Sequence, residues 1–92
     1  MDKVVIDFTG CKYLGELHLE LKNKLQFPDF YGENLDALWD CITGMVKVPD
    51  YVQIKGIGSL KPDIQEHAMK IYDIFDEAKK EFGDFRSLEL VD

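Results

Sequence analysis

Three short apolar segments have the patterns of β-strands. Val4, Val5 and Ile6 form a continuous β-branched run, which is typical of a strand buried on both faces. Apolar and polar residues alternate over residues 51–55 and again over residues 88–90, which indicates strands with one exposed face. We therefore expect the first strand to be central, with the other two at the edges of the sheet. Because helical segments separate the three strands, they should run parallel and be joined by right-handed crossovers.

The first helical pattern lies between the first two strands. Leucines recur every four residues from Leu17 to Leu25, which gives a helix with one apolar face. Gly15 is a candidate N-cap, and Pro28 should end the helix. His18 falls within this helix, and we interpret it as a structural or solvent-facing histidine, not a catalytic one.

The longest helical pattern precedes the last strand. Apolar residues recur at alternating spacings of four and three over residues 64–82, and we interpret this stripe as core, not as a cofactor site. Asp63 and Glu66 have the spacing of a capping box at its start, and Gly83 marks its expected end. The glycine-punctuated residues 56–60 are expected to form a single helical turn.

A shorter helix is predicted over residues 35–42, within the segment FYGENLDALWDCITGMV that runs from residue 30 to residue 46. Asn34 can cap its start, because the side-chain oxygen can accept from the open N–H groups of the first turn. Gly44 provides a stop just beyond it. The apolar side of this helix consists of Leu35, Leu38 and Ile42.

The opposite side of this short helix is acidic. Asp36 and Asp40 are four residues apart, so their charges repel each other, and Trp39 lies on the border between the polar and apolar sides. One interpretation is a solvated acidic face with the tryptophan packed into the domain. The other is a recognition surface, in which an aromatic anchor among carboxylates awaits a basic partner. The residues of the helix alone leave both interpretations open.

The segment from Tyr31 to Cys41, with Thr43 and Gly44 after it, resembles the signature of the barstar family, intracellular inhibitors of barnase-type secreted ribonucleases. The resemblance runs along the whole chain, through residues 4–6, 17–18, 28 and 75–79. It implies one barstar-like α/β domain over residues 1–92, with a three-stranded parallel sheet packed with about four helices. It also implies a cis peptide bond between Val48 and Pro49, and it favours the recognition surface for the acidic helix.

The resemblance further implies how that surface works. Asp40 matches the carboxylate that mimics a substrate phosphate, and Asp36 matches a second carboxylate that faces the same basic wall. Phe30 falls where the family has a tyrosine that packs on a catalytic histidine, and Glu77 matches an outlying carboxylate at the rim. The partner-binding residues expected in this way are Phe30, Tyr31, Gly32, Asn34, Leu35, Asp36, Trp39, Asp40, Thr43, Gly44, Met45, Val46 and Glu77.

Three positions depart from the family pattern. Phe30 lacks the phenolic hydroxyl, Met45 stands where the archetype has a second tryptophan, and Lys47 stands where it has an acid. These differences leave the inhibitor class intact and leave the exact nuclease open. The alternatives are an immunity protein or antitoxin for a different nuclease or toxin, and a regulatory module that binds proteins through the same acidic face.

Composition limits the partner and the compartment. Eighteen acids against eleven bases give a net charge of −7, which argues against nucleic acid and suits a basic protein partner. The family resemblance implies that this partner is bound in a 1:1 complex. No apolar run approaches the length of a membrane span, and the N-terminus has no secretory pattern, so we expect a cytoplasmic protein. In that setting Cys11 and Cys41 should be reduced, mostly buried thiols.

The sequence carries no convincing catalytic pattern. It has no phosphate-binding glycine loop, no Cys or His pair at zinc spacing and no nucleophile elbow, so we expect no cofactor and no metal. Asp36 and Asp40, with Glu33 or His18, could form an acid–base pair or a divalent-metal site. Nothing supplies a nucleophile or oxyanion donors, however, and we therefore expect that the protein is not an enzyme.

Overall fold

The computed structural model describes residues 3–45, 48–82 and 87–91. Its strands are β1 (Lys3–Asp7), β2 (Tyr51–Lys55) and β3 (Ser87–Val91), and its α-helices are α1 (Leu14–Leu25), α2 (Leu35–Asp40) and α3 (Pro62–Phe82). A π-helical turn, η1 (Cys41–Met45), continues α2, and a 3-10 turn, η2 (Ile57–Ser59), follows β2. The described residues thus contain three α-helices, where about four helices were expected, and the turn predicted over residues 56–60 is the 3-10 turn.

The three strands form one parallel sheet in the order β1-β2-β3. The parallel sheet was predicted correctly, but the prediction that β1 is central is wrong, because β2 holds that position. The free edge of β1 is covered by α1 instead of by a strand. The backbone N–H of Asp7 donates to Glu20 at 2.9 Å, and Nζ of Lys24 donates to the carbonyl of Val5 at 3.1 Å.

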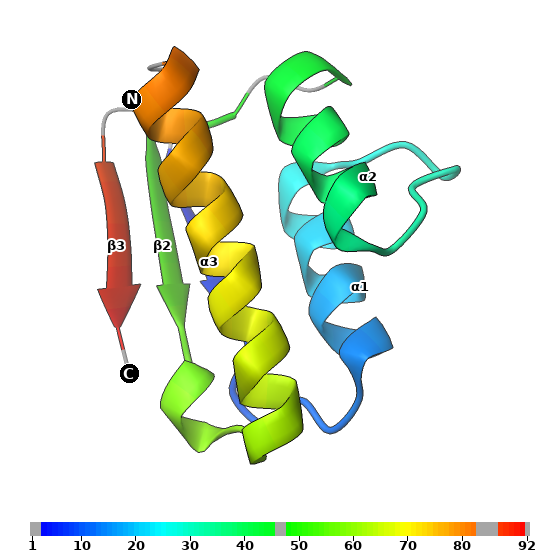
Figure 1. Ribbon diagram of the computed structural model, residues 1–92, viewed down its shortest axis with the longest axis vertical. Helices are drawn as coiled ribbons and strands as arrows, with labels where there is room; N and C mark the ends of the chain where they lie inside the picture. The colour runs from blue at the N-terminus through cyan, green and yellow to red at the C-terminus, as the bar shows by residue number, and fades with distance from the viewer. Residues whose placement is uncertain (1–2, 46–47, 83–86, 92) are drawn as a thin grey trace.

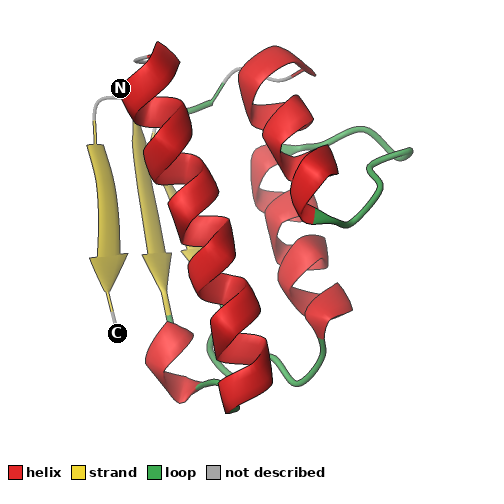
Figure 2. Cartoon of the chain, viewed as in Figure 1, coloured by secondary structure: helices red, strands yellow, loops and turns green. Residues whose placement is uncertain are grey.

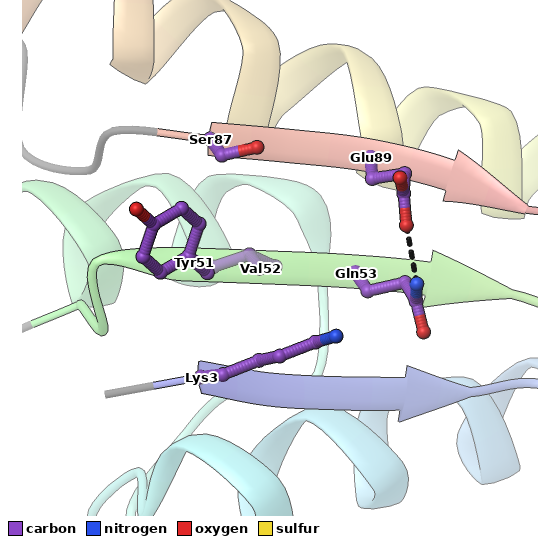
Figure 3. Close-up of a pocket in the computed structure, with 6 residues that line it drawn as sticks. All are labelled: Lys3, Tyr51, Val52, Gln53, Ser87 and Glu89. Carbon is purple, nitrogen blue, oxygen red and sulfur yellow. Dashed lines mark hydrogen bonds between the residues drawn. The ribbon is translucent and has the colours of Figure 1, made fainter. Parts of the chain in front are cut away.

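The helices cover one face of the sheet, as α3 does in Figures 1 and 2. On that face Ile6, Val52 and Ile54 are buried. The core residues predicted from the periodic patterns are also buried: Leu17, Leu21, Leu38, Ile42, Ile71 and Phe75. The other face carries residues that all remain at least partly exposed, and Figure 3 shows Lys3, Tyr51, Gln53, Ser87 and Glu89 along it, with the Gln53 amide donating to Glu89.

Two local expectations need correction. Helix α1 begins one residue before Gly15, so its N-cap is Tyr13 and not Gly15. The carboxylate of Glu16 in the first turn reaches back and accepts from the backbone N–H groups of Lys12 at 2.9 Å and Tyr13 at 3.2 Å. No peptide bond between described residues is cis, and the Val48–Pro49 bond is therefore trans. The expected helix end at Gly83 lies outside the described residues.

The loop between α1 and α2 projects from the helical layer, away from the sheet. In Figure 1 β2 and β3 lie on one side of α3, and the loop that joins α1 to α2 projects on the other side, away from β3. Helix α2 packs against α3 and leads directly into η1. The segment singled out from the sequence therefore lies on the helical side of the molecule. Within the described part of the chain, no helix is both long enough and apolar enough to cross a membrane.

Candidate protein-binding site

The loop between α1 and α2 is held in place by two buried aromatic side chains. Gln26 adopts a left-handed conformation with φ of 55°, which ends α1 and turns the chain. Phe27 and Tyr31 then lie in the core with their ring centroids 4.8 Å apart, and the Tyr31 N–H donates to the Pro28 carbonyl at 2.9 Å. Phe30, between these anchors, is 76% exposed. The loop therefore presents a large apolar ring to solvent from a fixed backbone.

Helix α2 begins at the cap that the sequence predicts. Oδ1 of Asn34 accepts from the Ala37 N–H at 2.8 Å, and its Nδ2 donates to the Gly32 carbonyl at 3.2 Å. Glu33, just before the cap, has a left-handed φ of 52°. The Asn34 side chain thus joins the start of the helix to the loop that carries Phe30.

Replacing Asn34 by alanine should lower the free energy of unfolding by about 1 kcal/mol, because one N–H of the first turn loses its acceptor. Asn34→Asp is the matched control, since it retains an acceptor for Ala37, while the amide donor to Gly32 is replaced by a negatively charged oxygen. Urea unfolding of the parent and both variants measures the effect. A loss for Asn34→Asp as large as that for Asn34→Ala would show that the cap is not what stabilises this turn.

The two sides of α2 have the environments that the apolar pattern predicts. Leu38 is fully buried, Trp39 is half-buried at the border, and Asp36 and Asp40 are exposed. Leu35 and Ala37 are partly buried and pack against the core. Because both carboxylates lie on the solvent side, their charge is accessible to a partner, and none of the ion pairs between described residues includes either of them.

We expected Gly44 to stop this helix, but the helical chain runs through it. The chain continues through Gly44 as the wider turn η1, and the Thr43 hydroxyl donates to the Trp39 carbonyl at 2.6 Å. A helix-ending glycine takes a left-handed conformation, and the described glycines with positive φ are Gly10 and Gly56, not Gly44. Gly44 is exposed on this turn, where the lack of a side chain leaves the backbone open to a partner.

A small pocket connects the exposed ring to the acidic helix. It is lined by Phe30, Tyr31, Gly32, Ala37, Asp40 and Cys41. Burial raises the pKa of both the Tyr31 hydroxyl and the Cys41 thiol, so both stay protonated at neutral pH. Asp40 therefore supplies the negative charge of this pocket. The arrangement suits a partner group that is both flat and positively charged.

Two other residues predicted to bind the partner, Tyr31 and Glu77, contribute less directly to the exposed surface of α2 and its loop. Glu77 is exposed on α3, the helix against which α2 packs. Tyr31 is only 6% exposed, so its side chain supports the loop from inside and its backbone is what a partner could reach. Val46 and Lys47 lie outside the described residues. In the described part of the chain, no three His, Cys, Asp or Glu side chains are grouped so that they could hold a metal ion.

One buried polar group was not predicted as such from the sequence. His18 is 1% exposed and is bonded to both the Tyr31 hydroxyl and His67. His18 is therefore structural, one of the two environments that we expected for it. His67 was not singled out at all. Its one sequence signal is its place next to Ala68, at the border of the apolar stripe of α3.

Cys11 and Cys41 are not joined to each other by a disulfide. Cys41 is buried, whereas Cys11 is partly exposed. Burial also raises the pKa of the Cys11 thiol, and the charges of Glu16, Glu20 and Asp7 act in the same direction. Both thiols are therefore mostly protonated at neutral pH, which makes them poor nucleophiles.

Comparison of the sequence with known proteins identifies the family of this chain. The sequence model of the family described as "Barstar (barnase inhibitor)" matches residues 1–91. The chain belongs to the barstar family. A protein of Bacillus subtilis (strain 168) named "Putative ribonuclease inhibitor YrdF" is 39% identical over 84 residues, which cover 91% of this chain and 92% of that protein. Membership of the barstar family supports ribonuclease inhibition in general, as opposed to catalysis.

Proposed function

We propose that this chain inhibits a secreted, guanyl-type ribonuclease resembling barnase by inserting the acidic side of α2 and the adjoining loop into the enzyme's active site. Support comes from membership of the barstar family and from the name of the Bacillus subtilis relative. One structural observation carries the proposal. An exposed carboxylate, Asp40, and an exposed aromatic ring, Phe30, line the same pocket.

The chemistry of the enzyme explains why this pair would inhibit it. A ribonuclease active site holds a phosphate with converging Arg, Lys and His side chains. A carboxylate offers two acceptor oxygens to the same donors and has no bond that the enzyme can cleave. In the barstar family this phosphate mimicry is the known mode of inhibition, and Asp40 is the residue that matches the inserted carboxylate. Asp36, one helical turn away, would face the same basic groups.

The aromatic residues would complete the 1:1 interface. The Phe30 ring, held outside by buried neighbours, would stack on the imidazole of a catalytic histidine without the hydrogen bond that a tyrosine could add. Half-buried Trp39 would contribute the apolar contact beside the carboxylates. Because the loop is already fixed in the free protein, little conformational entropy would be lost on binding. We propose that this encounter protects the cytoplasm before the enzyme is secreted.

A second candidate is immunity against a nuclease toxin with a differently shaped active site. It is favoured by the departures at the edge of the motif, where Lys47 replaces an acid and Met45 replaces a rigid aromatic residue. A basic enzyme rim would repel Lys47. Parallel inhibition assays against a barnase-type ribonuclease and against basic nuclease toxins of other classes distinguish the two candidates, since each predicts inhibition of a different enzyme.

Association with the target enzyme should depend strongly on salt. Acidic inhibitor and basic enzyme attract each other over about 10 Å at 0.1 M ionic strength, and added salt screens this attraction. The association rate should therefore fall about tenfold or more between about 10 mM and 0.5 M salt. Stopped-flow mixing with a barnase-type ribonuclease measures it. An association rate that is indifferent to salt would contradict the charge complementarity on which the proposal depends.

A further inference from the structure

A buried chain of hydrogen bonds links α3 to the recognition loop, here the residues between α1 and α2. Nε2 of His67 on α3 lies 2.9 Å from Nε2 of His18 on α1. Nδ1 of His18 lies 2.6 Å from the Tyr31 hydroxyl oxygen, and Tyr31 is next to Phe30 in the loop. Among the described residues, His18 is the one polar side chain that is buried. A change at His67 can therefore reach the loop through two hydrogen bonds.

Each of these hydrogen bonds needs one proton between its two atoms. When both imidazoles are neutral, two arrangements satisfy both bonds. In the first, Tyr31 donates to Nδ1 of His18, and Nε2–H of His18 donates to His67. In the second, Nε2–H of His67 donates to His18, whose Nδ1–H donates to the Tyr31 oxygen. Each neutral arrangement therefore keeps Tyr31 bonded to the helices.

The first and second extra protons have different effects on these two hydrogen bonds. One extra proton on His67 is compatible with the second arrangement, since His67 still donates to His18. A second extra proton, on His18, places hydrogens on both Nε2 atoms. Two donors then face each other, and two positive rings lie with their centroids 5.1 Å apart. The bond between the histidines cannot survive in the doubly protonated state.

The surroundings offer little to compensate these charges. The charged or titratable groups that act on the cluster are Lys70 from α3, Glu33 from the loop and Cys41 from η1. On α1 itself Lys22 is one turn beyond His18, and its Nζ lies 3.9 Å from Asp29. In the part of the chain that the structure describes, no carboxylate is bonded to either imidazole.

The same surroundings shift the titration of both rings. Burial, followed by the charge of His67, lowers the pKa of His18 from 6.5 to about 4. Burial, followed by the charge of Lys70, lowers the pKa of His67. Because the unfolded chain binds these protons more readily, the stability of the fold should decrease as the pH falls from about 6.5 towards 4.

We propose that His67 is a positioning residue for the recognition loop: through His18 it holds Tyr31, and with it Phe30, in the binding arrangement. Double protonation of the histidine pair breaks the bond between the two rings, and their repulsion displaces the His18 ring together with the Tyr31 side chain that is hydrogen-bonded to it. The effect on partner binding rests on the proposed function, whereas the effect on the loop does not. Acid would therefore weaken the complex by protonating the two histidines of the inhibitor, in addition to the effect of any groups that titrate on the enzyme.

His67→Gln is the decisive variant. Glutamine does not titrate, and its side-chain oxygen can accept from Nε2–H of a protonated His18, whose Nδ1–H still reaches Tyr31. Removing the charge of His67 should raise the pKa of His18 above its value of about 4, while burial, which is the larger cause of the shift, still holds it below 6.5. Because the chain has two histidines, the His18 ring gives the one remaining imidazole titration in an NMR measurement on this variant. An unchanged pKa for His18 would overturn the proposal.

The loop can be followed without a partner through the amide of Tyr31, which donates to the Pro28 carbonyl. In the parent, the hydrogen-exchange protection factor of this amide should fall by at least about fourfold between pH 7 and pH 3.5, because His18, with a pKa of about 4, is mostly protonated at the lower pH. In His67→Gln it should stay within about twofold. The amide of buried Leu38 is the internal control for general loosening. Equal loss of protection at both amides would refute a specific effect on the loop.

Tyr31→Phe provides a second test if His67→Gln does not fold. It retains the packed ring and removes the hydrogen bond to His18. The free energy of unfolding should therefore still decrease in acid, whereas the hydrogen-exchange protection of the residue 31 amide should no longer follow the titration of the histidines. Inhibition of a barnase-type ribonuclease by parent and His67→Gln, compared across the same pH range, then tests the link to binding. The enzyme's own titration cancels in this comparison. No inhibition by either protein at neutral pH would refute the proposed function and leave the loop measurements to decide the role of His67.

Discussion

Replacing Asp40 by alanine should weaken inhibition of the cognate ribonuclease by more than about thirtyfold, or about 2 kcal/mol. In the proposed complex the basic groups of the active site surround this carboxylate in a dry interface. Removing it would leave those groups buried and without a partner, which costs more than the loss of the contact itself. Since Asp40 is exposed in the free protein, its removal should change the free energy of unfolding by no more than about 0.5 kcal/mol.

The measurement combines ribonuclease inhibition with thermal unfolding of the same proteins. Glu66→Gln on α3 is the matched control for lost charge, because Glu66 is also exposed and pairs with Lys70 at 3.6 Å. Asp36→Ala should weaken inhibition less than Asp40→Ala, and Glu77→Ala less again, because a rim carboxylate stays screened by solvent. If Asp40→Ala unfolds the protein, or inhibits as well as the parent does, Asp40 does not act as a phosphate mimic.

Replacing Phe75 by alanine should lower the free energy of unfolding by about 3–5 kcal/mol. Phe75 lies on the buried side of α3 and is fully enclosed. The smaller side chain would lose apolar burial and leave a cavity that a packed interior fills only in part. Urea unfolding measures the change, and Phe75→Leu, which retains most of the volume, should cost markedly less. A loss below about 1 kcal/mol for Phe75→Ala would show that this part of the core is not tightly packed.

The sequence predicts the elements of this fold better than their arrangement. Alternation over β2 correctly indicates a strand with one buried face, because periodicity reports which face is packed. It does not report whether a neighbouring strand lies on each side. The apolar run of β1 suggested a central strand, whereas Val5 is half-buried at an edge that α1 covers. Position in a sheet depends on contacts between distant segments, which local patterns do not contain.

In the candidate site, too, local features could be predicted from the sequence, and contacts between distant residues could not. Asn34 as the helix cap and the exposure of Asp36 and Asp40 could be predicted, because both depend on neighbours within one turn of helix. The burial of Tyr31 could not, since its hydroxyl is bonded to His18, thirteen residues earlier. The bond between His18 and His67 spans 49 residues and joins two helices, so no spacing within either helix predicts it.

The covered edge of β1 also has a consequence for the protein at high concentration. An exposed edge strand can pair with a strand from another molecule and so begin ordered aggregation. On β1, the N–H of Asp7 and the carbonyl of Val5 face outwards but are already bonded to Glu20 and Lys24 of α1. An incoming strand would first have to displace both side chains. Double substitution of Glu20 and Lys24 should therefore open the edge of β1 to strand pairing and increase ordered aggregation at high concentration relative to the parent.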